Sequence, residues 1–294
     1  MSSPWQSMVE QSLGVEHAQW VDCGHSGWGR SYSLHGHAAR YFVKSASGRY
    51  ASTLESEADG LAALRSTKAI RVPEGVARLA SNDTSILVLE WLDIGAARDD
   101  AALGSALAAL HRATPPHGPD GERYGWTRDN WIGGTLQHNQ WTDDWCAFFR
   151  EQRLAPQLAL ADRHRAGGRI ARDGERLLTK LAALLRGHAP QPSLLHGDLW
   201  AGNAAALAGR EPVVFDPAVY VGDREADIAM TELFGGFGPD FYAAYNDAWP
   251  LERDYEIRRD VYNLYHVLNH LNLFGGSYRQ HAEGIVARLL AITG

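Results

Sequence analysis

The feature that most constrains this chain of 294 residues is a set of three polar side chains in its second half. The run HGDLWAGN at 196–203 contains Asp198 and Asn203, and the apolar run VVFD at 213–216 ends in Asp216. Either run alone is typical of an ordinary turn or strand end. Their joint spacing indicates one site, in which a carboxylate orients a hydroxyl proton and oxygen ligands hold a divalent cation.

The arrangement resembles the catalytic loop of kinases, H-x-D-x-x-x-x-N, followed by a second aspartate after a strand. The pattern predicts that Asp198 accepts or orients the proton of the substrate hydroxyl. It assigns Asn203 and Asp216 to a magnesium ion. Pro217 and Ala218 stand where protein kinases have Phe and Gly, so we expect a different local conformation after Asp216.

An upstream lysine fits the nucleotide side of the same pattern. Lys44 ends the run RYFVK, and in kinases a strand lysine binds the nucleotide phosphates and pairs with a helix glutamate. Glu57, inside a predicted helix over 54–65, is the expected partner. Glu55 on the same helix remains the alternative.

A glycine-containing segment at 21–32, VDCGHSGWGRSY, is expected to cover the phosphates, with Gly27 close to them. The segment lacks the G-x-G-x-x-G pattern, and a plain hairpin turn has the same composition. Further on, Glu90, Trp91 and Leu92 lie where two lobes should join. Their backbone groups are expected to meet the adenine.

Hydrophobic periodicity predicts strands first and helices later. Strands at 31–36 and 39–44 read as a hairpin, and 85–92 reads as a buried strand with a partner near 76–80. Helical patterns follow at 54–65, 100–112, 142–161, 175–187, 259–275 and 281–294.

This order of elements predicts an α+β, protein-kinase-like fold with two lobes. Residues 1–92 are expected to form a small N-lobe with an antiparallel sheet that covers the nucleotide. Residues 93–294 are expected to form a larger, mainly helical C-lobe with the catalytic loop and substrate pocket. In the helix at 142–161, Thr142 is the expected cap and Pro156 a possible kink.

Composition excludes several classes of function. The net charge of −7 disfavours a nucleic-acid partner, and 45% hydrophobic with 21% charged residues is ordinary for a globular protein. Two cysteines, Cys23 and Cys146, cannot build a disulfide framework or a zinc site. No signal peptide and no apolar run of ~18 residues is apparent, so we expect a cytoplasmic protein without a membrane partner. Nothing in the sequence selects an oligomeric state.

Two longer segments, 125–158 (GWTRDNWIGGTLQHNQWTDDWCAFFREQRLAPQL) and 215–237 (FDPAVYVGDREADIAMTELFGGF), accompany the catalytic loop. With HGDLWAGN, they resemble the fructosamine-3-kinase (ketosamine-3-kinase) family, which is related to aminoglycoside phosphotransferases. The resemblance runs from about Lys44 to the C-terminus. Trp200 and the run GDREADIAMT distinguish it from aminoglycoside and choline kinases of the same fold.

The resemblance implies a mechanism and a substrate. ATP and Mg²⁺ bind between the lobes, Asp198 orients the sugar 3-hydroxyl, and Lys44 with magnesium stabilises the phosphate charge. The product, a fructosamine 3-phosphate, is unstable and frees the amine, which amounts to deglycation. The expected partner is therefore a small-molecule ketosamine or a glycated lysine of a protein.

The same resemblance suggests residues for the sugar pocket. Trp200 could stack on the sugar, or it could pack in the core of the lobe. Asn130, Gln137 and Trp141 could line the pocket, and a packing or turn role for each is the alternative.

Three further residues are expected to support the catalytic loop, and Cys23 is considered separately. His196 is interpreted as a structural residue of the catalytic loop, and Asp223 and Asp227 are expected to brace that loop through backbone hydrogen bonds. Some relatives carry a redox-active cysteine in the glycine segment. Cys23 matches that place only loosely, and we interpret it as a small packed thiol.

Two other functions are compatible with the motifs. One is a kinase of the same fold that acts on another small alcohol, such as an aminoglycoside or an amino alcohol. The other is a catalytically silent nucleotide-binding module, against which the presence of Lys44, Asp198, Asn203 and Asp216 speaks.

Overall fold

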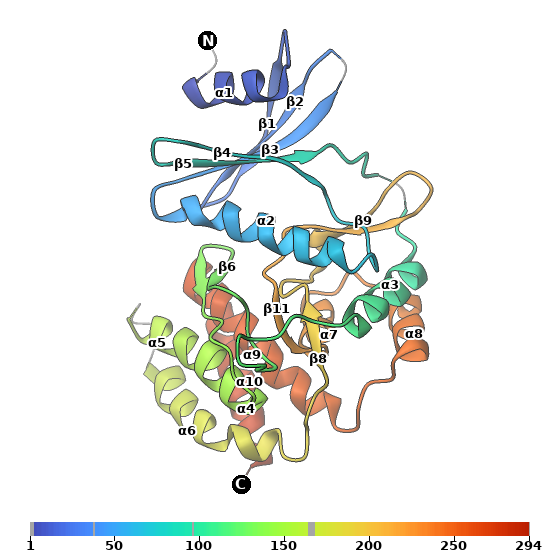
Figure 1. Cartoon of the computed structure of the whole chain (residues 1–294). Coiled ribbons are helices and arrows are strands. Elements are labelled where there is room, and N and C mark those ends of the chain that lie inside the picture. Colours follow the sequence, from blue (N-terminus) through green and yellow to red (C-terminus); the bar gives the residue numbers. More distant parts are fainter. Residues whose placement is uncertain (1–2, 38, 96, 164–167, 294) are drawn as a thin grey trace.

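The computed structural model describes residues 3–37, 39–95, 97–163 and 168–293 of the chain. Its N-terminal part is built on a five-stranded sheet, and its C-terminal part consists mostly of helices (Figure 1). The predicted two-lobed α+β architecture is therefore confirmed.

The sheet of the N-lobe is antiparallel throughout, with the strand order β1-β2-β3-β5-β4. The hairpin expected at 31–44 and the partner strand expected near 76–80 are both present. The strands are β1 (Gln19–His25), β2 (Arg30–His35), β3 (Arg40–Ser47), β4 (Gly75–Ser81) and β5 (Thr84–Glu90).

Both faces of this sheet are covered by helices (Figure 1). Successive strand residues point to opposite faces, so Ile86 and Val88 join the cluster around Val9 of α1 (Pro4–Leu13). Leu87 and Leu89 join the main core together with α2 (Ala51–Ser66). Helix α1 is not among the elements predicted from the sequence. A short 3₁₀ turn, η1 (Gly48–Tyr50), leads from β3 into α2.

The C-lobe surrounds a central helix, α9 (Tyr255–Phe274), most of whose side chains are buried. Three small hairpin-like ladders, β6–β7, β8–β11 and β9–β10, connect the helices. The other elements are α3 (Asp100–Arg112), β6 (Asn130–Ile132), β7 (Thr135–Gln137), α4 (Trp145–Phe148), a π-helix (Phe149–Leu154), α5 (Ala155–Arg163), α6 (Gly168–Leu184), β8 (Pro192–Leu195), η3 (Ala201–Asn203), β9 (Ala204–Ala206), β10 (Pro212–Val214), β11 (Tyr220–Asp223), α7 (Glu225–Leu233), α8 (Pro239–Ala248) and α10 (Tyr278–Ile292).

The helix predicted over 142–161 is wrong in detail. Helical structure begins only at α4, and its cap is Asp144, whose side chain accepts from the N–H of Ala147. Thr142, two residues earlier, accepts from the N–H of Asp144. A π-helix then precedes α5. Because Pro156 has no N–H to donate, a regular α-helical ladder cannot run through it, and the wider turns come directly before it.

The two lobes are joined by the chain between β5 and α3, and by contacts of α2. The predicted division between residues 92 and 93 falls in that connection and stays a prediction. Gly60 of α2 lies so close to the C-lobe that a Cβ there would be 3.2 Å from Pro217 and 3.3 Å from Val219. The helix thus packs directly on the segment that follows Asp216. Among the described helices, none has the length and apolarity needed to cross a membrane.

The packing of α3 on α8 yields a prediction of stability. A Cβ at Gly104 would lie 2.2 Å from the carbonyl oxygen of Phe241, so Gly104→Ala forces the two backbones apart. We expect it to lower the free energy of unfolding by ~1–3 kcal/mol, measured by urea denaturation. The control is Gly284→Ala in α10, where only the end of Arg288 lies within 4 Å. It should raise the free energy of unfolding by ~0.5–1 kcal/mol, and equal effects of the two changes would contradict the packing argument.

Candidate active site

A cavity of about 820 Å³ lies between the lobes and is lined by residues of both. It brings together side chains that are far apart in the sequence, such as Lys44 and Asp216, which are 172 positions apart. The predicted site residues on its wall are Lys44, Glu57, Glu90, Trp91, Leu92, Asp198, Trp200, Asn203 and Asp216.

Lys44 on β3 links the two lobes. Its Nζ lies 2.7 Å from Glu57 Oε1 on α2 and 2.5 Å from Asp216 Oδ1 in the C-lobe. Burial alone would lower the pKa of Lys44, but the carboxylates of Asp216 and Glu57 outweigh it and raise that pKa. The ammonium is thus held charged. Glu55, the alternative partner, points away and pairs with Arg128 at 2.7 Å.

Asp198 sits on the loop after β8, and its environment favours the protonated form. Burial, together with the negative charges of Asp216 and Asp227, raises its pKa to about 7, against a hydrogen bond from Asn203 that lowers it. The Nδ2 of Asn203 donates to the backbone oxygen of Asp198 at 2.9 Å and lies 3.4 Å from its Oδ2. The carboxylate is therefore poised to take up a proton near neutral pH.

The loop that carries Asp198 is held from beneath by Asp227, as predicted. The two carboxylate oxygens of Asp227 accept from the N–H groups of His196 at 2.7 Å and Gly197 at 2.8 Å. His111 on α3 lies 3.1 Å from the same carboxylate. Burial would raise the pKa of Asp227, but His111 and these hydrogen bonds hold it below its usual value. His196 is fully buried and its Nε2 donates to the carbonyl of Phe215, which fits the structural role expected for it.

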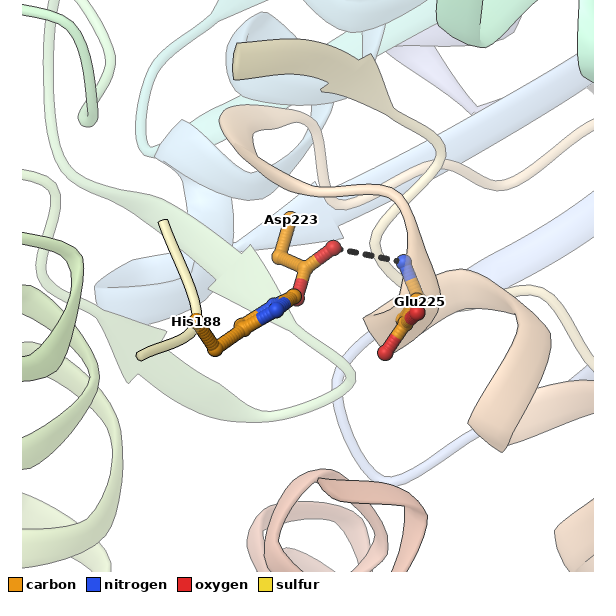
Figure 2. Close-up of side chains that lie close together, drawn as sticks. All are labelled: His188, Asp223 and Glu225. Carbon is orange, nitrogen blue, oxygen red and sulfur yellow. Dashed lines mark hydrogen bonds and ion pairs between the residues drawn. The ribbon is translucent and has the colours of Figure 1, made fainter. Parts of the chain in front are cut away.

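Asp223 does not brace the catalytic loop, contrary to the prediction. It lies in a separate cluster with His188 and Glu225, shown in Figure 2, where it accepts from His188 Nε2 at 2.6 Å and from the backbone N–H of Glu225 at 3.0 Å. Arg258 donates to both carboxylate oxygens of Glu225, at 2.6 and 3.0 Å. The potential ligand atoms are thus engaged by protein partners, and hydrogen bonds from Tyr262 and Arg258 tie β11 and α7 to α9.

Asp216 and Asn203 fit the requirements of a magnesium site. Asp216 has a left-handed backbone, with a φ of 58°, and its side chain is 47% exposed in the cavity wall. Because Nδ2 of Asn203 is used as a donor, its Oδ1 is the atom that remains for a cation. One carboxylate and one amide oxygen, with room for water and phosphate, are the donors that Mg²⁺ takes in phosphoryl-transfer sites.

The glycine segment covers the cavity with residues other than the predicted one. Gly24 and Gly29 line the cavity, whereas Gly27, in the bend between β1 and β2, is not among the described residues that line it. Trp28 reaches across to the C-lobe. Its ring packs so close to the β6–β7 turn that a Cβ at Gly134 would be 2.9 Å from it. The large residue in this segment therefore closes the cleft on that side.

The junction of the lobes provides the opposite wall. The side chain of Glu90 is occupied by Arg71 at 2.6 Å and by the backbone N–H of Glu74 at 2.6 Å. The guanidinium of Arg40 lies over the ring of Trp91, with its Cζ 4.8 Å from the ring centroid. Because the side chains of Glu90 and Trp91 are engaged in these contacts, mainly their backbone groups are left to face the cavity. This is what the expected contact with the adenine ring requires.

Three of the four residues suggested for the sugar pocket lie elsewhere. Asn130 and Gln137 are 2% and 1% exposed, and their amides bind the backbone carbonyls of Val219 and Ala218. Trp141 packs against the main core. Of the two roles left open for these three residues, the structure shows the packing role, because their side chains satisfy or cover buried groups behind the site. Trp200 alone of the four lines the cavity, and it is 41% exposed.

Cys23 lines the mouth of the cavity and is exposed, so the interpretation as a packed thiol is wrong. Its Sγ lies 3.7 Å from the carbonyl oxygen of Val21 on the same strand. Cys146 is half-buried, and burial raises the pKa of its thiol.

Known proteins resemble this chain along almost its whole length. The family model described as fructosamine kinase matches residues 1–292. A probable ketoamine kinase from Synechocystis sp. is 43% identical over 99% of this chain and 98% of its own. A protein-ribulosamine 3-kinase, chloroplastic, from Arabidopsis thaliana is 41% identical over 85% of this chain and 76% of its own.

Solved structures of known proteins are similar to this chain in fold. A candidate fructosamine-3-kinase from Haemophilus somnus superposes with a TM-score of 0.85 at 31% identity, covering 97% of each chain. An aminoglycoside phosphotransferase superposes with a TM-score of 0.63 at 15% identity, covering 99% of this chain and 98% of its own, which confirms the kinase-like fold. On the sequence and structure matches together, this chain belongs to the fructosamine kinase family.

Proposed function

We propose that this chain is an ATP-dependent kinase that phosphorylates the sugar 3-hydroxyl of fructosamines and related ketosamines. The observation that carries the proposal is the cavity between the lobes, in which Lys44, Asp198, Asn203 and Asp216 converge. Family membership supports the choice of substrate, since the relatives are named ketoamine and ribulosamine kinases.

Asp198 is the catalytic residue in this proposal. Its carboxylate accepts a hydrogen bond from the sugar hydroxyl and so aligns the oxygen for attack on the γ-phosphorus of ATP. The raised pKa of about 7 makes it a better proton acceptor than an ordinary aspartate as the bond to phosphorus forms. Asp227 keeps the loop in place, because it holds two consecutive backbone N–H groups.

Lys44 and the magnesium ligands manage the phosphate charge. The ammonium of Lys44, fixed by Glu57, donates to phosphate oxygens when ATP is bound and turns from Asp216 toward them. Asn203 and Asp216 would hold Mg²⁺, which neutralises the negative charge of the phosphates in the transition state. Gly24 and Gly29 let the backbone of the β1–β2 hairpin approach the phosphates.

The substrate side of the cavity is open beside Trp200. An indole face suits the C–H faces of a sugar, and we assign Trp200 to the ketosamine. The exposed position of this ring admits either a small amine or the side chain of a glycated lysine as the rest of the substrate. The likeness to aminoglycoside phosphotransferases is one of fold alone, so we propose no aminoglycoside activity.

Turnover of a substrate panel tests the function. Fructosamines and ribulosamines of lysine should drive ATP consumption with a phosphate placed on the 3-oxygen, whereas amino alcohols and aminoglycosides should not. Asp198→Asn, which keeps the size of the side chain, should lower kcat by ~10²-fold or more while ATP still binds. Turnover of an amino alcohol without any ketosamine would overturn the substrate, and full activity of Asp198→Asn would overturn the catalytic assignment.

The two glutamates of α2 give a matched pair of variants. Glu57→Gln removes the buried partner of Lys44, so we expect KM for ATP to rise about tenfold with a fall in kcat. The carboxylate of Glu55 is 57% exposed and pairs with Arg128 at the surface. Glu55→Gln should therefore leave kcat and KM for ATP within twofold of the wild type. Steady-state kinetics at varied ATP concentration measure both constants for each variant. A stronger effect of Glu55→Gln than of Glu57→Gln would contradict the assignment of Glu57 as the partner of Lys44.

The pKa of Asp198 predicts the pH dependence. The active form is the carboxylate, so kcat/KM for the ketosamine should fall on the acid side, approaching tenfold per pH unit. Burial with Asp216 and Asp227 raises the pKa to about 7 in the absence of a cation, and Mg²⁺ lowers it by its positive charge. The acidic limb should therefore lie at or below pH 7 and move to higher pH when Mg²⁺ is subsaturating. A profile that stays flat down to about pH 5 at low Mg²⁺ would refute this role for Asp198.

A further inference from the structure

A buried guanidinium lies behind the active site and has no role in the chemistry described so far. Arg153, in the π-helix, is fully buried, and no carboxylate of the described residues forms an ion pair with it. Its charge faces aromatic rings instead, 4.1 Å from the centroid of Tyr220, 4.6 Å from Phe148 and 5.7 Å from Tyr265. Its Nε has no hydrogen-bond partner.

From this cation a line of amides leads to the backbone beside Asp216. Arg153 Nη2 donates to Asn139 Oδ1 at 2.7 Å, and Asn139 Nδ2 donates to Asn130 Oδ1 at 2.9 Å. Asn130 Nδ2 then donates to the carbonyl of Val219 at 2.6 Å. A guanidinium can only donate and a carbonyl can only accept, so the orientation of both amides is fixed by the two ends of the line.

A second branch reaches the neighbouring peptide. Gln137 Nε2 lies 2.8 Å from Asn130 Oδ1 and 3.1 Å from the carbonyl of Ala218. Tyr265 donates its hydroxyl to Gln137 Oε1 at 2.8 Å, which fixes this amide as well. The N–H of Ala218 binds the carbonyl of His196 at 2.8 Å. Two successive carbonyls just after Asp216 and Pro217 are thereby held, and the same segment is tied to the catalytic loop.

The charge of Arg153 explains why the line is ordered. A buried cation without a carboxylate is costly, and here the cost is offset by the aromatic faces and by Nη1, which donates to the carbonyls of His138 and Gln152. Its positive charge polarises the amides in series and strengthens each donor toward the backbone carbonyls. The left-handed backbone of Asp216 needs such support, since a φ of 58° is unfavourable for a residue with a Cβ.

We propose that Arg153 is a positioning residue, which acts through Asn139, Asn130 and Gln137 to hold Asp216 in the conformation that binds Mg²⁺. The proposal rests on the proposed kinase function and adds a determinant of its metal requirement. Arg153 touches neither nucleotide nor sugar. Removing it should weaken Mg²⁺ binding at Asp216 and leave the orientation of the hydroxyl by Asp198 largely intact.

The test measures how nucleotide binding depends on Mg²⁺. Binding of the non-hydrolysable analogue AMP-PNP is followed by calorimetry over a series of Mg²⁺ concentrations, beside kcat at saturating Mg²⁺. For Arg153→Met we expect the Mg²⁺ concentration at half-maximal binding to rise about tenfold, with kcat at saturation within about threefold. Arg153→Lys keeps the charge but not the fork of donors, and should lie between this variant and the wild type.

Two more variants separate positioning from stability. Gln137→Leu removes the hydrogen bonds of Gln137 with Ala218, Asn130 and Tyr265 but leaves the line from Arg153 to Val219 in place. It should raise the Mg²⁺ requirement about threefold, which keeps the test decisive if Arg153→Met fails to fold. Leu158→Ala in α5 removes a buried side chain outside the line, and should lower Tm without changing the Mg²⁺ requirement. A wild-type Mg²⁺ requirement in folded Arg153 and Gln137 variants, or an equal shift in Leu158→Ala, would overturn the proposal. Absence of Mg²⁺-dependent AMP-PNP binding by the wild type would instead refute the kinase function itself.

Discussion

The ion pairs of Lys44 are the interaction on which the candidate site depends. One ammonium holds Glu57 of α2 at 2.7 Å and Asp216 of the C-lobe at 2.5 Å, so it joins the two lobes across the cavity. Two carboxylates this close would repel each other without the cation between them. The same arrangement suits a nucleotide, because phosphate and Mg²⁺ can take over the charges that Lys44 and Asp216 now offer each other.

Much of this site could be predicted because its residues follow local patterns. HGDLWAGN and VVFD set Asp198, Asn203 and Asp216 within a short stretch of chain, and a lysine at the end of a strand needs only the sheet to be placed correctly. The choice between Glu55 and Glu57 was different. Both lie on one helix, and only the direction of each side chain in space, toward Arg128 or toward Lys44, separates them.

The roles that the sequence could not predict are determined by tertiary contacts. The sequence leaves a sugar-pocket role and a packing role open for Asn130 and Gln137, because a polar side chain in a family-like segment suits either. Their amides satisfy carbonyls 89 and 81 positions away, respectively, and no periodicity in the sequence indicates such a partner. The sequence does not indicate that Arg153 is buried either, since a single arginine in a helix is normally a surface residue.

The unfavourable features of the molecule gather around the same few peptides. Asp198 is buried beside other negative charges, Asp216 has a left-handed backbone, and Arg153 is a cation enclosed by rings with one unpaired N–H. Each costs stability, and each is held in place by contacts from several elements at once. Strained or desolvated groups persist only where the surroundings impose them. Asp198 and Asp216 lie on one cavity wall and Arg153 is buried behind it, and this grouping is itself an argument that this wall is the catalytic one.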